Sequence, residues 1–82
     1  MKIYAIYDRI AETYTNITVD SSDATARRNF EFAVSQSVQL QFYCKNYELR
    51  CIGEIDLKTG IIVPQIAASL VCTGNEVLPH EI

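Results

Sequence analysis

The fold is decided by the run Val19-Asp20-Ser21-Ser22-Asp23-Ala24-Thr25-Ala26-Arg27-Arg28-Asn29-Phe30-Glu31-Phe32-Ala33-Val34-Ser35-Gln36-Ser37, where the apolar spacing changes from that of a strand to that of a helix. Residues 20–23 are of the types that cap helix N-termini, because their side-chain oxygens accept from the free amides of the first turn. The spacing predicts a helix from Asp23 to about Ser37. One arc of it would pack on a sheet and contains Ala26, Phe30, Ala33, Val34 and Ser37.

Phe32 lies outside this arc, far around the helix near Arg28. Two interpretations are open. Phe32 is either tucked under a loop or marks a surface that faces a partner, and an aromatic residue beside an arginine is a common pair in such interfaces. Phe32 and Arg28 are therefore the candidate interface residues.

Two strands are predicted before the helix. Residues 2–8 alternate and carry apolar or aromatic groups on both faces, which is typical of a central strand. Residues 12–19 resume a strand composition after a turn at residues 8–11, so a hairpin is expected. Within the second strand, one side should carry Thr13, Thr15, Ile17 and Val19.

The segment after the helix is harder to interpret. Residues 38–44 alternate and fit either a short strand or an extended loop. Residues 47–56 predict a strand in which Gly53 marks a bulge or a close approach by the helix. A hairpin loop with Gly60 at a positive φ leads to a return strand at residues 61–63.

Pro64 should place that return strand at an edge or end it, since proline cannot donate to a ladder, and residues 67–73 are a candidate last strand. Together these segments predict an α+β class: one domain over residues 1–78, with an antiparallel sheet of about four to five strands and one helix, in ββαββ order. The end of the chain from Glu76, and residues 79–82 above all, is expected to fray.

The composition limits the possible functions. The chain has 82 residues and a net charge of −3. No stretch approaches the ~18 apolar residues of a membrane span, so no membrane partner is expected. The acidic balance argues against a protein that coats DNA by charge alone. Because so short a chain buries a limited core, a homo-oligomer, most simply a dimer, is expected.

Catalytic and metal chemistry find no support in the sequence. His80, the single histidine, lies in the C-terminal tail, whereas a general base needs a rigid position. Four groups could in principle bind zinc but lack paired spacing: Cys44, Cys51, Cys72 and His80. The three cysteines are interpreted as reduced, buried packing groups. No metal, cofactor or enzymatic activity is predicted.

Binding of single-stranded nucleic acid is a stronger possibility, because such proteins combine basic side chains with aromatic platforms. The candidate DNA-binding residues are Arg27, Arg28, Lys45, Arg50, Tyr43 and Tyr47. Three of them also have a plain structural explanation. Tyr47 fits the core pattern, Lys45 fits a loop, and Glu31 lies one helical turn from Arg27 and could offset its charge.

Several segments in collinear order resemble one family. They are Met1 to Asp8, Ala11 to Tyr14, the A-x-R-x-F motif at Ala26 to Phe30, Tyr47 to Leu49, Ile52 to Asp56, Thr59 to Ile62 and Thr73 to Val77. Together they resemble the small nonstructural protein of gokushovirus-type microviruses, phages with single-stranded DNA genomes. In residues 38–46 the chain is more apolar than many relatives.

The resemblance implies a nonstructural phage protein associated with genome synthesis and DNA binding, acting in the cytoplasm of the bacterial host and absent from the virion. It implies no catalytic residues. Two hypotheses follow. The chain binds single-stranded DNA as an oligomer, or it is an interaction module that self-associates and docks a host or viral replication protein through Phe32 and a sheet edge.

Overall fold

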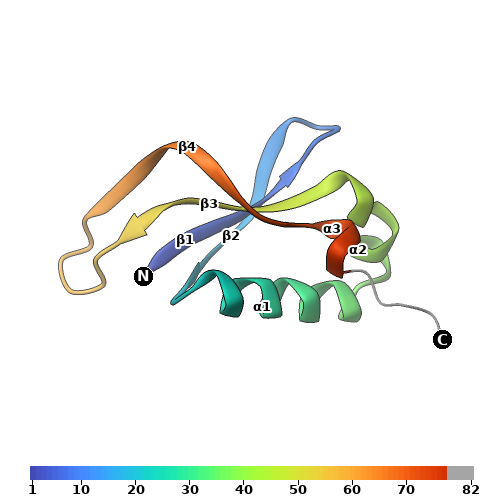
Figure 1. The fold of residues 1–82 in the computed structure, drawn as a ribbon, viewed down its shortest axis with the longest axis horizontal. Helices are drawn as coiled ribbons and strands as arrows, with labels where there is room; N and C mark the ends of the chain where they lie inside the picture. Colours follow the sequence, from blue (N-terminus) through green and yellow to red (C-terminus); the bar gives the residue numbers. More distant parts are fainter. Residues whose placement is uncertain (78–82) are drawn as a thin grey trace.

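The computed structural model describes residues 1–77. Its elements are β1 (Lys2–Asp8), β2 (Thr13–Asp20), α1 (Asp23–Gln36), α2 (Val38–Tyr43), the 3-10 turn η1 (Cys44–Asn46), β3 (Tyr47–Ile55), β4 (Ile62–Thr73) and α3 (Gly74–Val77). The strands form one antiparallel sheet in the order β2-β1-β3-β4, and α1 runs along one of its faces (Figure 1). The predicted α+β class and central first strand are confirmed, and the order matches ββαββ apart from the additional short helical elements α2, η1 and α3. The expected frayed segment 79–82 lies outside the described residues.

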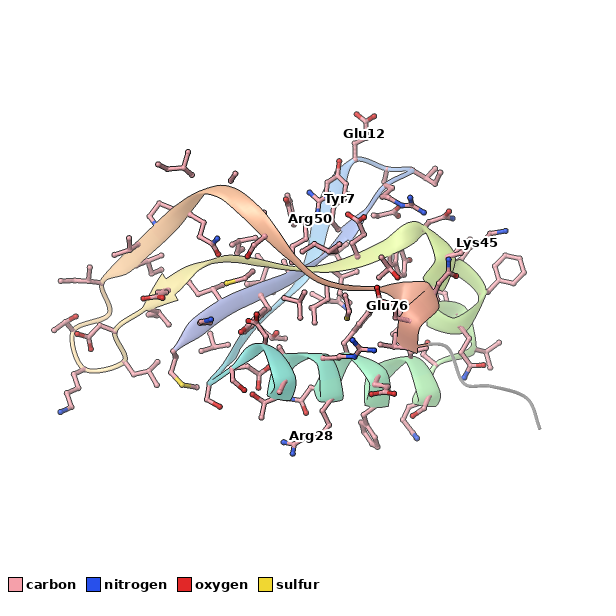
Figure 2. The ribbon with its side chains drawn as sticks, viewed as in Figure 1. Tyr7, Glu12, Arg28, Lys45, Arg50 and Glu76 are labelled. Carbon is pink, nitrogen blue, oxygen red and sulfur yellow. The ribbon has the colours of Figure 1, made fainter. Side chains whose placement is uncertain are left out.

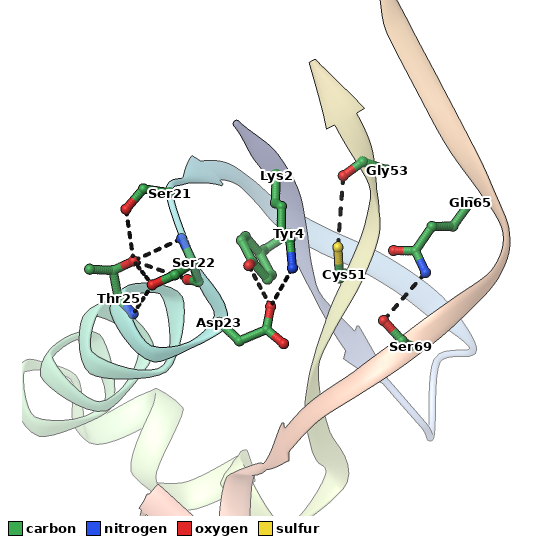
Figure 3. A network of polar contacts seen from close by, with 10 residues as sticks. All are labelled: Lys2, Tyr4, Ser21, Ser22, Asp23, Thr25, Cys51, Gly53, Gln65 and Ser69. Carbon is green, nitrogen blue, oxygen red and sulfur yellow. Dashed lines mark hydrogen bonds and ion pairs between the residues drawn. The ribbon is translucent and has the colours of Figure 1, made fainter. Parts of the chain in front are cut away.

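The start of α1 is fixed by a capping box, as the polar run before it predicts. The Ser22 hydroxyl accepts from the Thr25 amide at 3.2 Å, and the Thr25 hydroxyl accepts from the Ser22 amide at 3.1 Å (Figure 3). Two free amides of the first turn are thereby satisfied. Three side chains of the predicted arc, Ala26, Phe30 and Val34, are buried against the sheet.

Tyr4 ties the central strand to this helix. Its side chain is fully buried, and its hydroxyl donates to Asp23 Oδ1 at 2.6 Å (Figure 3). Lys2 reaches the same carboxylate at 3.6 Å. Burial, followed by the Asp23 carboxylate, raises the pKa of Tyr4. The contact therefore holds a neutral tyrosine at the junction of β1 and α1.

Residues 38–44 are helical, so both interpretations offered for them were wrong. α2 begins after Ser37, whose hydroxyl accepts from the Leu40 amide at 3.2 Å, and η1 follows it directly. The alternation of apolar residues had the period of a strand, but the Ser37 cap and the short link between α1 and β3 favour a helical turn.

The return strand and the candidate last strand are one continuous edge strand, β4, so the sheet has four strands. Pro64 lies within it and does not end it. Gly53 does mark a bulge, but the close approach is by β4 and not by the helix. A Cβ at Gly53 would lie 2.7 Å from the Val63 carbonyl oxygen. Gly60 has the expected positive φ, 77°.

The end of the described chain is packed and not frayed as far as Val77, contrary to expectation. α3 places Val77 in the core at 2% exposure, and a Cβ at Gly74 would lie 1.8 Å from the Cys44 carbonyl oxygen. Arg27 pairs with Glu76 of this turn at 3.3 Å and not with Glu31. The three cysteines are buried and free, as predicted.

β2 departs from simple alternation. Thr15 pairs with Ile6 of the helix-covered face, whereas Val19 pairs with Ile3 of the other face. The prediction that Thr15 and Val19 share one side of the strand was therefore wrong. The irregularity lies at Asn16, whose φ is 52°. Asparagine is one of the few residues that adopt this conformation readily. Within residues 1–77, no helix has the length and hydropathy needed to cross a membrane.

Candidate nucleic-acid interface

An arginine stacked on two tyrosines is the main polar feature of the sheet face opposite α1. Tyr7 and Tyr14 are cross-strand neighbours of β1 and β2, with ring centroids 4.8 Å apart. The Arg50 guanidinium lies 4.0 Å from the centre of the Tyr7 ring and 5.9 Å from that of Tyr14. This stacking over the ring faces is a cation–π arrangement. We call Tyr7, Tyr14, Arg50 and Glu48 the open-face cluster.

The strand register places this cluster on one face. Tyr7 lies opposite Tyr14 on β2 and Glu48 on β3, and directly opposed residues of antiparallel strands share a face. Tyr4 and Ile6 alternate with Tyr7 and point to the helix side. Tyr7 and Arg50 accordingly lie on the side of the sheet away from α1 (Figure 2).

The cluster is organised by internal hydrogen bonds. Arg50 Nε donates to Glu48 Oε1 at 3.0 Å, and Arg50 Nη1 donates to the Tyr14 hydroxyl at 3.1 Å. The Tyr14 hydroxyl, and after it Glu48, raises the pKa of Arg50, which remains a cation. Because Glu48 offsets this charge, the cluster offers aromatic surface more than net positive charge.

Two further cations lie near the end of β1. Arg9, in the β1–β2 turn, donates to the Lys45 carbonyl oxygen at 2.6 Å, and its amide donates to the Asn46 carbonyl oxygen at 2.9 Å. The side chains of Arg9 and Lys45 are exposed and form no ion pair within residues 1–77. They therefore carry positive charge that no direct ion pair of the described chain neutralises, in a region that also contains Asp8 and Glu12.

The predicted basic residues do not form a single surface. Arg28 projects from the outer side of α1, and Arg50 lies across the sheet from it (Figure 2). Arg27 is half-buried and engaged by Glu76. The structure thus separates Arg27 and Arg28 from Arg50, while Lys45 belongs to η1 at one end of the molecule.

The two predicted tyrosines also differ in place. Tyr43 is 43% exposed and meets Phe42 edge-on, with ring centroids 4.9 Å apart. Tyr47 is half-buried against the core and lines a hollow of about 320 Å³ between β2 and α2, on the helix side. Burial raises the pKa of Tyr47. Neither residue contributes to the open-face cluster. Tyr47 packs against the core, as its place in the strand pattern indicated.

Sequence reasoning missed Tyr7, Tyr14 and Arg9 as site residues. A signal for the tyrosines was present, because a hairpin centred between Ile10 and Ala11 pairs positions 7 and 14 directly. Arg50 joins them through the β1–β3 pairing, which links segments far apart in sequence and has no local signal.

The Phe32 side chain is 66% exposed. It lies on the same side of α1 as Arg28, because residues four positions apart in a helix share a face. Of the two interpretations, the loop-covered one is wrong, because no described residue covers the ring. Phe32 remains a candidate interface residue.

These observations define a small α+β domain with one helix-covered and one open sheet face. A family model described as Phage ORF5 protein matches residues 1–77, so the chain belongs to this family and is a bacteriophage protein. No curated protein and no solved structure matches it significantly.

Proposed function

We propose that the chain is a non-catalytic, nonstructural protein of a gokushovirus-type phage. It binds single-stranded DNA with its open sheet face during genome synthesis or packaging, in the cytoplasm of the infected bacterium. The observation that carries this proposal is the open-face cluster, in which an arginine stacks on two tyrosines of a face that α1 leaves free. The sequence resemblance and the phage family support the setting.

The chemistry of the cluster suits single strands. Bases without a partner strand stack on aromatic side chains whatever their sequence, and each stacked base contributes about 1–3 kcal/mol. Tyr14, which is 42% exposed, is the ring available for a base. Arg9 and Lys45, beyond the end of β1, supply positive charge for the phosphates. The net charge of −3 belongs to the whole chain and does not prevent a local attraction of this kind.

The test is titration of a fluorescent oligo-dT with the purified protein at 50 and 200 mM salt. Wild type should bind at 50 mM salt and more weakly at 200 mM, because phosphate contacts release counterions. Tyr14→Ala should weaken binding about 5- to 100-fold, the equivalent of one lost stacking contact. Tyr43→Ala is the matched control, since Tyr43 is exposed to the same extent but lies outside the cluster, and it should change affinity less than twofold.

Two results would contradict the proposal: wild type that fails to bind at 50 mM salt, or equal losses in Tyr14→Ala and Tyr43→Ala. Arg28→Glu separates this site from one on α1. Since Arg28 lies on the far side of the molecule, its charge reversal should leave most of the affinity intact.

A second candidate function is docking of a replication protein through α1. It is favoured by the 66% exposure of Phe32, a large apolar ring on a helix face that is otherwise polar. Introducing Phe32→Ala into the phage should lower its yield while the isolated protein keeps its fold by circular dichroism. Unchanged yield would rule this candidate out.

A further inference from the structure

The longest uncharged segment of the chain contains an edge strand, β4, most of whose residues are exposed. No acidic or basic residue and no histidine occurs from Gly60 to Asn75. All of β4 lies in this segment. Most of its side chains are exposed, and Ile66 is fully exposed. We call residues 60–73 the β4 arm, and its other exposed aliphatic residues are Ile61, Ile62, Val63 and Leu70. Surfaces of this kind mark interaction sites.

β4 is an edge strand, but its edge is shaped against plain strand addition. β4 advances five residues from Pro64 to Ser69 while β3 covers two from Gly53 to Cys51, so β4 has three extra residues. The extra residues form the outward arch of β4 in Figure 1. Gln65 Nε2 donates to Ser69 Oγ at 3.4 Å across it (Figure 3). Proline and bulges are the devices that keep edges from extending ladders indefinitely.

The arch therefore presents side chains and not a free ladder, with Ile66 fully exposed in it. A partner that fits must be apolar and must not need charged contacts. β2, the other edge of the sheet, differs in this respect, since Asp20 ends it and Glu12 precedes it. The two edges are thus not equivalent.

A second copy of the chain is the occupant that the charges favour. Each copy carries a net charge of −3, so two copies repel. In a two-fold contact the same patch meets itself, and any charge in it faces its own copy. The β4 arm carries no charged residue, so two copies of it can meet without that repulsion.

We propose that two copies of this chain associate through β4, about a two-fold axis near Ile66. The contact is led by aliphatic side chains and closes as a dimer, because the arch and Pro64 interrupt the edge that would otherwise propagate. A standard interface removes about 800 Å² from each partner, about one-seventh of the 5675 Å² surface of this chain. The proposal does not rest on DNA binding. The arch with Ile66 lies opposite residues 51–53 of β3, and β4 meets the open-face cluster further along, at Leu70 and Thr73.

The experiment is sedimentation of the purified full chain over a range of concentrations from about 1 to 300 μM. Wild type should change from monomer to dimer within this range. Ile66→Glu should remain monomeric throughout, because each glutamate would face its own copy. Val38→Glu is the matched control: it adds the same charge at an exposed apolar residue of α2, outside every proposed interface, and it should dimerise at the high end of the range.

A mixing experiment tests the two-fold axis itself. Ile66→Glu and Ile66→Lys should each be monomeric, and an equimolar mixture of the two should form a dimer again. The proposal is overturned if wild type remains monomeric at 300 μM, if Ile66→Glu dimerises like wild type, or if the mixture does not restore the dimer. Circular dichroism of each variant verifies the fold, and a failure here leaves the oligo-dT result unaffected.

Discussion

The two faces of the sheet use the same residue type in opposite ways. Tyr4 and Tyr7 both belong to β1. Tyr4 is fully buried under α1, where its hydroxyl donates to Asp23. Tyr7 is half-buried on the other face, where it stacks with Arg50 and Tyr14. The covered face joins elements of the fold to one another, whereas the open face holds aromatic and charged groups that a ligand can reach. Stability and binding should therefore respond to different substitutions.

The strongest contrast is between two phenylalanines on α1. Phe30 is 4% exposed in the core and Phe32 is 66% exposed. Phe30→Ala should lower the free energy of unfolding by about 3–5 kcal/mol, since it leaves a cavity. Phe32→Ala should change it by less than about 0.5 kcal/mol. Urea unfolding followed by circular dichroism measures both, and similar losses would mean that α1 does not divide core from surface as described.

Much of this covered face could be predicted from the sequence, because its signals are local. The polar run before Asp23 and the arc around Phe30 specify the cap and the buried side of α1. α2 could not be predicted in this way. Its apolar residues alternate like those of a strand, yet Val38 and Phe42 are exposed and the segment is set by its connection between α1 and β3.

The open face was harder to predict, because it depends on pairing between distant segments. Tyr7 and Tyr14 meet across a short hairpin, which a turn prediction can anticipate. Arg50 meets them only because β3 pairs with β1, and the continuity of β4 through Pro64 likewise depends on its place at the sheet edge. Local patterns carry no information on either contact.

The next prediction tests the junction between the covered face and α1. Tyr4→Phe keeps the buried ring and removes the hydroxyl that donates to Asp23. The free energy of unfolding should fall by about 1.5 kcal/mol, as for other hydrogen bonds to a charged group. Tyr7→Phe is the control on the open face and should cost less than about 0.5 kcal/mol. Equal effects in the two variants would remove the distinction between these tyrosines.

The covered face should also limit stability at high pH. Burial raises the pKa of the Cys72 thiol to about 11, from an ordinary value of 9.0. Because the folded state holds the thiol neutral, its contribution is fully present below pH 9 and is lost as the pH rises from 9 to 11. The free energy of unfolding, measured in a reducing buffer, should fall over this range.

Cys72→Ala should make that fall shallower without abolishing it, because burial also raises the pKa values of Cys44 and Tyr4. Identical pH profiles for Cys72→Ala and wild type would show that this thiol does not contribute.

The smallest expected change in stability concerns the open face and bears most directly on its function. Glu48→Gln keeps an oxygen that can accept from Arg50 but removes the charge that offsets the guanidinium. The free energy of unfolding should change by about 1 kcal/mol or less, because the pair is partly exposed.

The affinity of Glu48→Gln for oligo-dT at 50 mM salt should rise. The slope of log K against log salt should steepen by about 0.7, the value for one additional phosphate contact on a single strand. Glu31→Gln changes the net charge equally on exposed α1 and should leave the slope unaltered. If both variants steepened the slope alike, the net charge of the protein, and not Arg50 on the open face, would govern DNA binding.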